Sequence, residues 1–165
     1  ARGAFLISSE SENGMISLFQ KLYGLGIIRG KDEWEPRVNL LSWYEGGGYY
    51  TVIYFRAESR PACFEEEDLQ KRMLIGPASG EMSGIAIVSS RESFEELTDD
   101  RLGEIIREVS LPVNQIENMC TSLKTNQRTQ PDVSVGIMFV PEITAVFLTD
   151  YTFSGEKITG VESFK

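Results

Sequence analysis

Two chain segments rich in aromatic and β-branched residues, 38–44 and 49–56, lie on either side of the glycine run Gly46-Gly47-Gly48. Glycine adopts the positive φ angles of a tight turn without steric cost, so a short glycine turn between two such segments is a strong signal of a β-hairpin. A hairpin commits this part of the chain to antiparallel pairing. The chain must therefore build a sheet that is at least partly antiparallel.

The rest of the chain alternates between short apolar runs and amphipathic helical segments. The spacing predicts helices over 15–22, 64–74, 102–109 and 112–123, and strands over 4–7, 83–89, 133–140, 143–148 and 157–161. Ser93 and Glu96 have the spacing of a helix capping box. We therefore predict an α+β fold with a mainly antiparallel mixed sheet of about five to seven strands and helices packed on it.

The length and composition are those of one globular domain, since the chain has 165 residues of which 41% are hydrophobic and 25% charged. We predict a single α+β domain over residues 1–165. The segment Gly3-Ala-Phe-Leu-Ile-Ser-Ser resembles Gly84-Ile-Ala-Ile-Val-Ser-Ser, 81 residues later. This similarity suggests two β-α-β-β pseudo-repeats, 1–80 and 81–165. Chance is the alternative, because strand-to-helix junctions often end in serine caps.

The predicted element order resembles known folds only in outline. The first half reads β-α-β-β-α, and with residues 83–89 as the closing strand this order resembles a ferredoxin-like unit. A profilin-like or GAF-like central sheet fits the element list about as well. These resemblances concern element order alone and carry no residue motif, so they imply no site residues.

The chain contains no histidine. This excludes Ser–His and Cys–His nucleophile pairs, an imidazole general base and an imidazole metal ligand. The two cysteines, Cys63 and Cys120, are too few for a four-thiolate zinc site. We therefore assign no catalytic residue, no cofactor and no metal ligand. We expect both cysteines to be free, buried thiols, and a single disulfide is the alternative.

The net charge of −9 bears on the partners that the chain can bind. Nucleic acids and anionic membranes both need a basic surface, so we expect no nucleic-acid partner. No apolar stretch approaches the roughly 20 residues of a membrane-spanning helix, and no signal peptide is evident. We expect no membrane insertion and an intracellular, cytoplasmic location. Because Ala1 is not an initiator methionine and an apolar strand begins almost at once, we expect a domain cut from a longer chain or a processed product.

The aromatic residues beside the glycine turn are the best candidates for an interaction site. They are Trp43, Tyr44, Tyr49 and Tyr50. Side chains alternate between the two faces of a strand, so about half of these rings must lie on the solvent side. Exposed aromatic rings at a hairpin end suit a protein partner or a flat ligand. The alternative is cross-strand packing with cover from a neighbouring helix.

Two serine pairs, Ser8-Ser9 and Ser89-Ser90, lie at predicted strand ends before helix starts and are candidate anion-binding residues. Ordinary helix capping is the interpretation that we favour for these serines, since no glycine-rich phosphate loop accompanies them. The acidic runs 65–68 and 99–100 could hold a divalent cation, but neither has calcium-loop spacing. Lys21 and Lys71 would need burial to act as catalytic lysines.

These observations favour a non-catalytic protein-interaction or regulatory module that belongs to a larger chain or assembly. The expected partner is a protein, either a second copy of the chain or another part of the parent protein. A small-molecule sensor with a pocket between sheet and helices is a second hypothesis. A histidine-independent enzyme that uses carboxylate, tyrosine or serine is a third.

Overall fold

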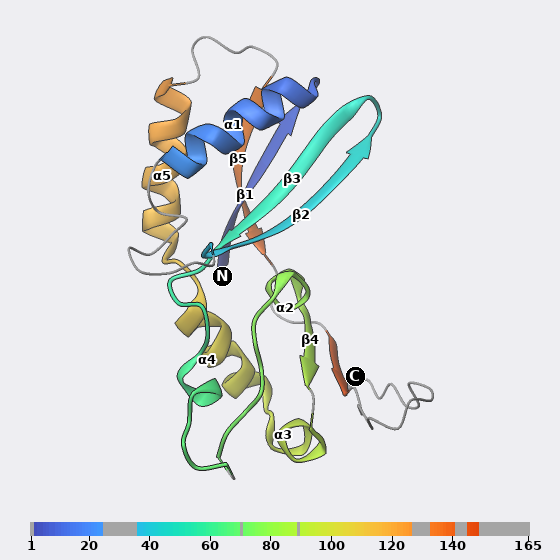
Figure 1. Ribbon diagram of the computed structural model, residues 1–165, viewed down its shortest axis with the longest axis vertical. Helices are drawn as coiled ribbons and strands as arrows, with labels where there is room; N and C mark the ends of the chain where they lie inside the picture. The colour runs from blue at the N-terminus through green and yellow to red at the C-terminus, as the bar shows by residue number, and fades with distance from the viewer. Residues whose placement is uncertain are drawn as a thin grey trace. The chain divides into compact units, whose positions relative to one another are not determined.

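The computed structural model describes residues 2–24, 36–69, 71–88, 90–126, 133–140 and 145–148. The chain divides into two compact units (Figure 1). Unit 1 comprises Ala1–Ala57 and Ser110–Val140, and unit 2 comprises Glu58–Val109 and Pro141–Lys165. The single domain and the pseudo-repeats 1–80 and 81–165 both stay predictions.

The centre of unit 1 is an antiparallel sheet of four strands in the order β2-β3-β1-β5. The strands are β1 (Arg2–Ser9), β2 (Val38–Glu45), β3 (Gly48–Phe55) and β5 (Val133–Val140). In this register Phe5 lies opposite Ile53 on one side and Ile137 on the other. The predicted α+β fold with a mainly antiparallel sheet is confirmed, but this sheet has four described strands and not the five to seven that were expected.

The predicted hairpin is confirmed as β2 and β3. Glu45 pairs with Gly48, and the two residues between them have φ angles of 58° at Gly46 and 87° at Gly47. Positive φ at both central residues is the signature of a type I′ turn, whose twist matches that of the flanking strands. The glycines therefore set both the position of the turn and the register of the hairpin.

Helices α1 (Glu12–Gly24) and α5 (Val113–Asn126) pack on the sheet through one hydrophobic core. The strand residues in this core are alternate ones, as expected when one face of a sheet is covered. The buried core residues are Phe5, Ile7, Met15, Leu18, Leu22, Ile53, Phe55, Ile116, Met119, Cys120, Leu123, Val133 and Val135. We call this side of the sheet the inner face and the opposite side the outer face.

The order β1-α1-β2-β3-α5-β5 is the βαββαβ order of a ferredoxin-like unit. The sequence predicted this order of elements, but it assigned the wrong segments to the second helix and to the closing strand. The second helix and the closing strand are α5 and β5, not residues 64–74 and 83–89. The reason is that residues 58–109 belong to unit 2 and are inserted between β3 and α5.

The two ends of this insertion meet within unit 1. Arg56 and Ser110 form an isolated antiparallel bridge, and the Leu111 N–H donates a hydrogen bond of 3.1 Å to the Phe55 carbonyl. The chain thus leaves unit 1 after β3 and returns beside the same strand before α5. An inserted segment whose ends are adjacent leaves the order of the surrounding elements undisturbed.

Unit 2 contains α2 (Ser79–Ser83), β4 (Ile85–Val88), α3 (Arg91–Glu96), α4 (Asp99–Val109) and β6 (Ala145–Leu148), preceded by the short 3-10 helix η1 (Ala62–Phe64). Strands β4 and β6 pair in parallel in a sheet of their own. The expectation of one sheet that contains residues 83–89 is therefore wrong. Among the described side chains of unit 2, the buried hydrophobic core residues are Cys63, Met73, Ile75, Met82, Ala86, Val88, Phe94, Leu102, Ile105, Ile106 and Val109.

The predicted helix over 64–74 is also wrong, since the described residues of this segment contain only the end of η1 and isolated turns. Competing hydrogen bonds explain the difference. The Met73 N–H donates to the Cys63 carbonyl at 3.0 Å, and Arg72 Nε donates to the Phe64 carbonyl at 2.8 Å. The four adjacent acidic residues at 65–68 would also repel one another if a helix brought their side chains close together.

The other local predictions have mixed outcomes. The helical face of Leu102, Ile105, Ile106 and Val109 is buried as predicted. The N-cap of α3 is Ser90, three residues before the predicted one, and its hydroxyl accepts a hydrogen bond from the Ser93 N–H at 3.1 Å. The predicted strand 157–161 lies outside the described residues. Among the described helices, none has the length and apolar character needed to cross a membrane.

Candidate functional site

The aromatic residues of the hairpin form two cross-strand pairs. Trp43 lies opposite Tyr50, with their rings stacked at 5.4 Å between centroids and 14° between planes. Tyr44 lies opposite Tyr49, with centroids 4.9 Å apart and planes tilted by 58°. Because consecutive residues point to opposite faces, the first pair lies on the outer face and the second on the inner face. The hairpin therefore presents an aromatic pair on each side.

The strand that carries each ring decides its exposure. Trp43 and Tyr44 on β2 are 42% and 63% exposed, whereas Tyr49 and Tyr50 on β3 are half-buried. Tyr49 also packs against the core under α1 and α5. Both sequence interpretations thus describe part of the arrangement, because the rings pack across the strands and the two on β2 remain open to solvent. Their role in partner binding stays a prediction.

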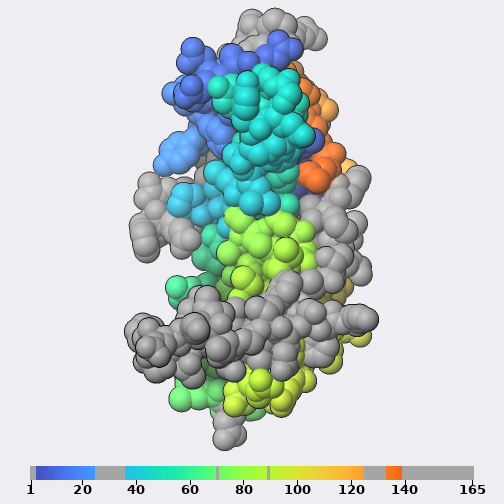
Figure 2. All heavy atoms as spheres, turned by 90° about the vertical axis from the view of Figure 1, so that its right-hand side faces the viewer, coloured from blue at the N-terminus to red at the C-terminus, as the bar shows by residue number. Residues whose placement is uncertain are grey.

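Among the described strands, β2 is one of the two edge strands of the unit 1 sheet, and β5 is the other. Strand β2 is exposed at six of its eight residues, including Leu40 at 42% and Leu41 at 40%. Leu41 and Trp43 lie on the outer face, and Leu40 and Tyr44 on the inner face. Edge strands usually carry charged residues that prevent association, but the one charged residue of β2 is Glu45. In Figure 2 the hairpin, in cyan, forms a continuous stretch of surface.

The first serine pair lies at the end of β1. Ser9 is 3% exposed, and its hydroxyl accepts a hydrogen bond from the Ser11 N–H at 3.1 Å and donates one to the Ser11 carbonyl at 2.8 Å. The Ser11 hydroxyl in turn accepts from the Gly14 N–H at 3.1 Å. These bonds account for Ser9 as part of the turn into α1. Ser8 is half-buried in β1.

The second serine pair belongs to unit 2. Ser90 caps α3, and its hydroxyl also lies 2.9 Å from the Ser93 hydroxyl. Ser89 lies outside the described residues. Helix α3 has only six residues, so its dipole is weak. The capping interpretation accounts for Ser90, and anion binding at either pair stays a prediction.

The carboxylates are mostly paired or solvated at the surface of unit 2. Glu65 accepts from Arg60 at 3.2 Å, and Asp68 lies 3.3 Å from Lys71 Nζ. Asp99 and Asp100 are exposed in the first turn of α4, where the helix dipole favours them. In the described part of the chain, no group of three or more acidic residues and cysteines is placed to hold a metal ion.

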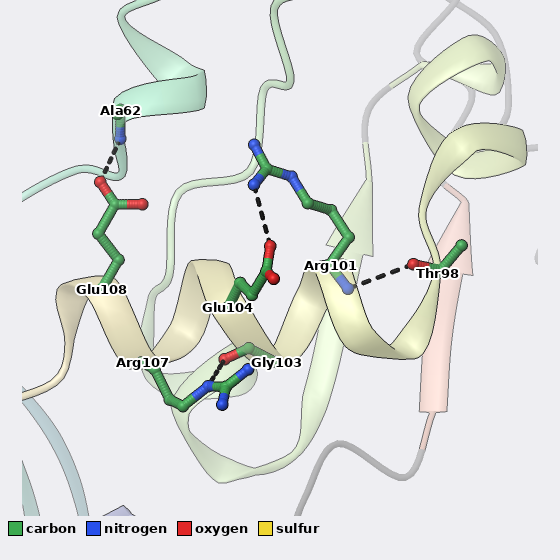
Figure 3. Close-up of polar contacts among 7 residues, drawn as sticks. All are labelled: Ala62, Thr98, Arg101, Gly103, Glu104, Arg107 and Glu108. Atoms are coloured by element: carbon green, nitrogen blue, oxygen red, sulfur yellow. Dashed lines mark hydrogen bonds and ion pairs between the residues drawn. The ribbon is translucent and has the colours of Figure 1, made fainter.

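Helix α4 carries the polar contacts drawn in Figure 3. The Arg101 guanidinium lies 3.2 Å from the Glu104 carboxylate, and its backbone N–H donates to the Thr98 hydroxyl at 3.2 Å. Glu108 Oε1 accepts a hydrogen bond of 2.7 Å from the Ala62 N–H, which ties η1 to the helix (Figure 3). These contacts connect elements within unit 2.

Both cysteines are buried and free, as the sequence predicted. Burial raises the pKa of the Cys63 thiol, the nearby Arg101 guanidinium lowers it, and the Glu108 carboxylate raises it. A thiol with a raised pKa is neutral at pH 7 and a poor nucleophile. Cys63 is therefore a core residue of unit 2.

Sequence reasoning missed one buried carboxylate, Glu81, which is 5% exposed. Its Oε2 accepts from the Ala78 N–H at 2.9 Å and its Oε1 accepts from the Ile87 N–H at 3.2 Å. Glu81 thus caps the start of α2 and holds the following strand β4. A capping box combines Ser or Thr at the N-cap with Glu or Gln three residues later. Here Glu81 occupies the later position, but the N-cap is an alanine, so the sequence shows only one of the two parts of the motif.

The described residues also line an open hollow of about 750 Å³ in unit 2. It lies between segment 68–74 and the start of α3, and its lining mixes acidic, basic and apolar side chains. The sensor hypothesis placed a pocket between sheet and helices. In unit 1 that space is occupied by the hydrophobic core.

No protein-family model, no curated protein and no solved structure matches the chain. The function is therefore argued from the geometry of the described residues.

Proposed function

We propose that the chain is a non-catalytic protein-interaction or regulatory module whose contact surface is the β2–β3 hairpin. The observation that carries this proposal is an edge strand with exposed apolar side chains on both faces. We call Leu41, Trp43, Tyr44, Tyr49 and Tyr50 the hairpin surface. A strand at the edge of a sheet can be a template for association, and proteins that remain monomeric usually protect such a strand with charge, proline or a bulge.

The chemistry of the hairpin surface suits a protein partner. Tryptophan and tyrosine dominate the binding energy of protein interfaces because they bury a large area and keep a polar group at the rim. Here the two exposed rings already contact rings of β3. Trp43 stacks on Tyr50 with 5.4 Å between centroids, and Tyr44 lies tilted against Tyr49 with 4.9 Å between centroids. A preordered ring loses little side-chain entropy on binding, which favours affinity.

The charge distribution supports the same surface. The chain has a net charge of −9, yet β2 and β3 together carry Glu45 as their one charged residue. Charged residues are depleted at the centre of protein interfaces, where their desolvation is costly. The hairpin is therefore an almost uncharged surface on an acidic chain, as is typical of the centre of a protein interface.

Site-specific photo-crosslinking tests this function. Tyr44 is replaced by a photoreactive phenylalanine analogue, and the matched control carries the analogue at Tyr23, which is 57% exposed on α1. Both variants are irradiated as the purified chain and in a cell extract. We expect protein adducts at position 44 in at least one of these samples and none at position 23. The absence of an adduct at position 44 in both samples would refute the proposal.

A further inference from the structure

We propose that the open hollow of unit 2 binds a small zwitterion that carries an ammonium group, a carboxylate and an apolar side chain. This is the chemistry of a free apolar amino acid or of a short apolar peptide. The hollow has a volume of about 750 Å³, which is within the usual range of small-molecule sites. It belongs to unit 2, whereas the hairpin surface belongs to unit 1, so this inference is independent of the proposed function.

One wall of the hollow is negatively charged. Glu92 and Glu96 line it from α3, and their four-residue spacing places them on the same side of the helix. Neither carboxylate forms an ion pair within the described part of the chain. Glu95, by contrast, lies outside the lining and pairs with Arg91 at 3.9 Å. Two neighbouring like charges repel each other, and a bound ammonium group would relieve that repulsion.

The other wall, formed by segment 68–74, carries positive charge. Arg72 Nε donates a hydrogen bond to the Phe64 carbonyl at 2.8 Å, and the guanidinium carbon lies 5.8 Å from the centre of the Phe64 ring. These contacts hold the side chain, while its two terminal nitrogens donate to no described residue. Such a guanidinium can bind a carboxylate through two parallel hydrogen bonds. Lys71 adds a second positive charge but already pairs with Asp68 at 3.3 Å.

The two walls carry opposite charges, yet no ion pair joins them among the described lining residues. Leu69 and Leu74 also line the hollow and are 77% and 45% exposed. The hollow thus combines two acidic groups, a guanidinium with free donors and uncovered apolar surface. A zwitterion with an apolar side chain can contact all three, with its ammonium at the glutamates and its carboxylate at Arg72. A ligand with a single charge would leave one wall without a partner.

NMR titration of the ¹⁵N-labelled chain with L-leucine and with the leucyl-leucine dipeptide tests this site. Low salt is used because exposed charges are then least screened. We expect saturable shifts of amide signals in segment 68–74 and α3 with at least one of the two zwitterions. Its amide lacks the carboxylate and its N-acetyl form lacks the ammonium, so each should bind at least about fivefold more weakly. No saturable shift with either zwitterion, or equal affinity for the capped forms, would overturn the proposal.

Matched variants test the two walls separately. E92Q/E96Q removes both carboxylates from the hollow and should weaken binding at least about fivefold, whereas the control E95Q, on the same helix, should change it less than about twofold. R72Q should weaken binding of the zwitterion at least about fivefold but that of its amide less than about twofold, because the amide has no carboxylate to bind. Circular dichroism checks that each variant is folded. Equal losses for E95Q and E92Q/E96Q, or equal losses of both ligands for a folded R72Q, would contradict the assigned site.

Discussion

Replacement of the two turn glycines should affect the stability of the hairpin differently. Gly46 and Gly47 have φ angles of 58° and 87°, and a Cβ added at either position meets no other atom within 4 Å. A substitution therefore acts through the backbone alone. The left-handed conformation costs an L-residue such as alanine about 1–2 kcal/mol, so Gly47→Ala should destabilise unit 1 by that amount.

Asparagine differs from alanine because its short polar side chain is tolerated in the left-handed region, and Asn-Gly is the preferred pair of a type I′ turn. Gly46→Asn creates that pair. It also restricts the unfolded chain more than glycine does, which is worth about 0.4–1 kcal/mol where the native angles are compatible. We expect Gly46→Asn to leave the stability unchanged or to raise it by that amount.

Urea unfolding followed by tryptophan fluorescence measures both changes, because Trp43 stacks on Tyr50 within the hairpin. The midpoint should fall for Gly47→Ala and stay or rise for Gly46→Asn at equal slopes. Equal losses for the two variants, or a loss below about 0.5 kcal/mol for Gly47→Ala, would contradict a type I′ turn at these residues.

Four further outcomes are expected. Glu81→Ala should destabilise unit 2 by about 1–3 kcal/mol in urea unfolding, because two backbone N–H groups lose their acceptor. Glu81→Gln should destabilise it less, and equal losses would contradict the role of Glu81 as a hydrogen-bond acceptor. Leu18→Ala in the unit 1 core should lower the free energy of unfolding by about 2–5 kcal/mol, and Ile16→Ala, at an exposed position, should lower it by under about 0.5 kcal/mol. Similar losses for the two variants would argue against the assigned core. Since the folded pKa of Cys63 is raised above its ordinary value of 9.0, stability should hold below pH 9 and fall as the pH rises through the folded pKa, and Cys63→Ala should lose this pH dependence in melting curves. A chain in which a short glycine linker joins Ala57 to Ser110 in place of 58–109 should keep the antiparallel sheet by circular dichroism, and a random-coil spectrum would show that unit 1 depends on the insertion.

Local signals in the sequence predicted the elements whose formation depends on near neighbours. The glycine turn defined the hairpin because Gly46 and Gly47 adopt the positive φ angles that a type I′ turn requires. The spacing of Leu102, Ile105 and Ile106 defined the buried face of α4 because one helix presents them on one side. The failure over 64–74 has the same physical basis, since hydrogen bonds to Cys63 and Phe64 replaced the helical ones.

Local signals in the sequence could not predict the contacts between distant parts of the chain. Nothing near residues 133–140 indicates that this strand, rather than residues 83–89, pairs with β1, because the choice depends on where the inserted unit 2 begins and ends. The role of Glu81 was missed for a related reason. Its second partner, the Ile87 N–H, comes within reach only when β4 folds back beside α2.

The sequence by itself determined that four aromatic residues flank a tight turn, and that neighbours along each strand point to opposite faces, because side-chain alternation is a property of any extended strand. Only the tertiary structure decided which rings remain exposed. Strand β3 lies between β1 and β2, and its Tyr49 and Tyr50 are half-buried. Strand β2 is an edge strand among those described, and its Trp43 and Tyr44 are exposed. The order of strands in a sheet depends on pairing between segments far apart in the chain, and that order places the aromatic side chains at an edge.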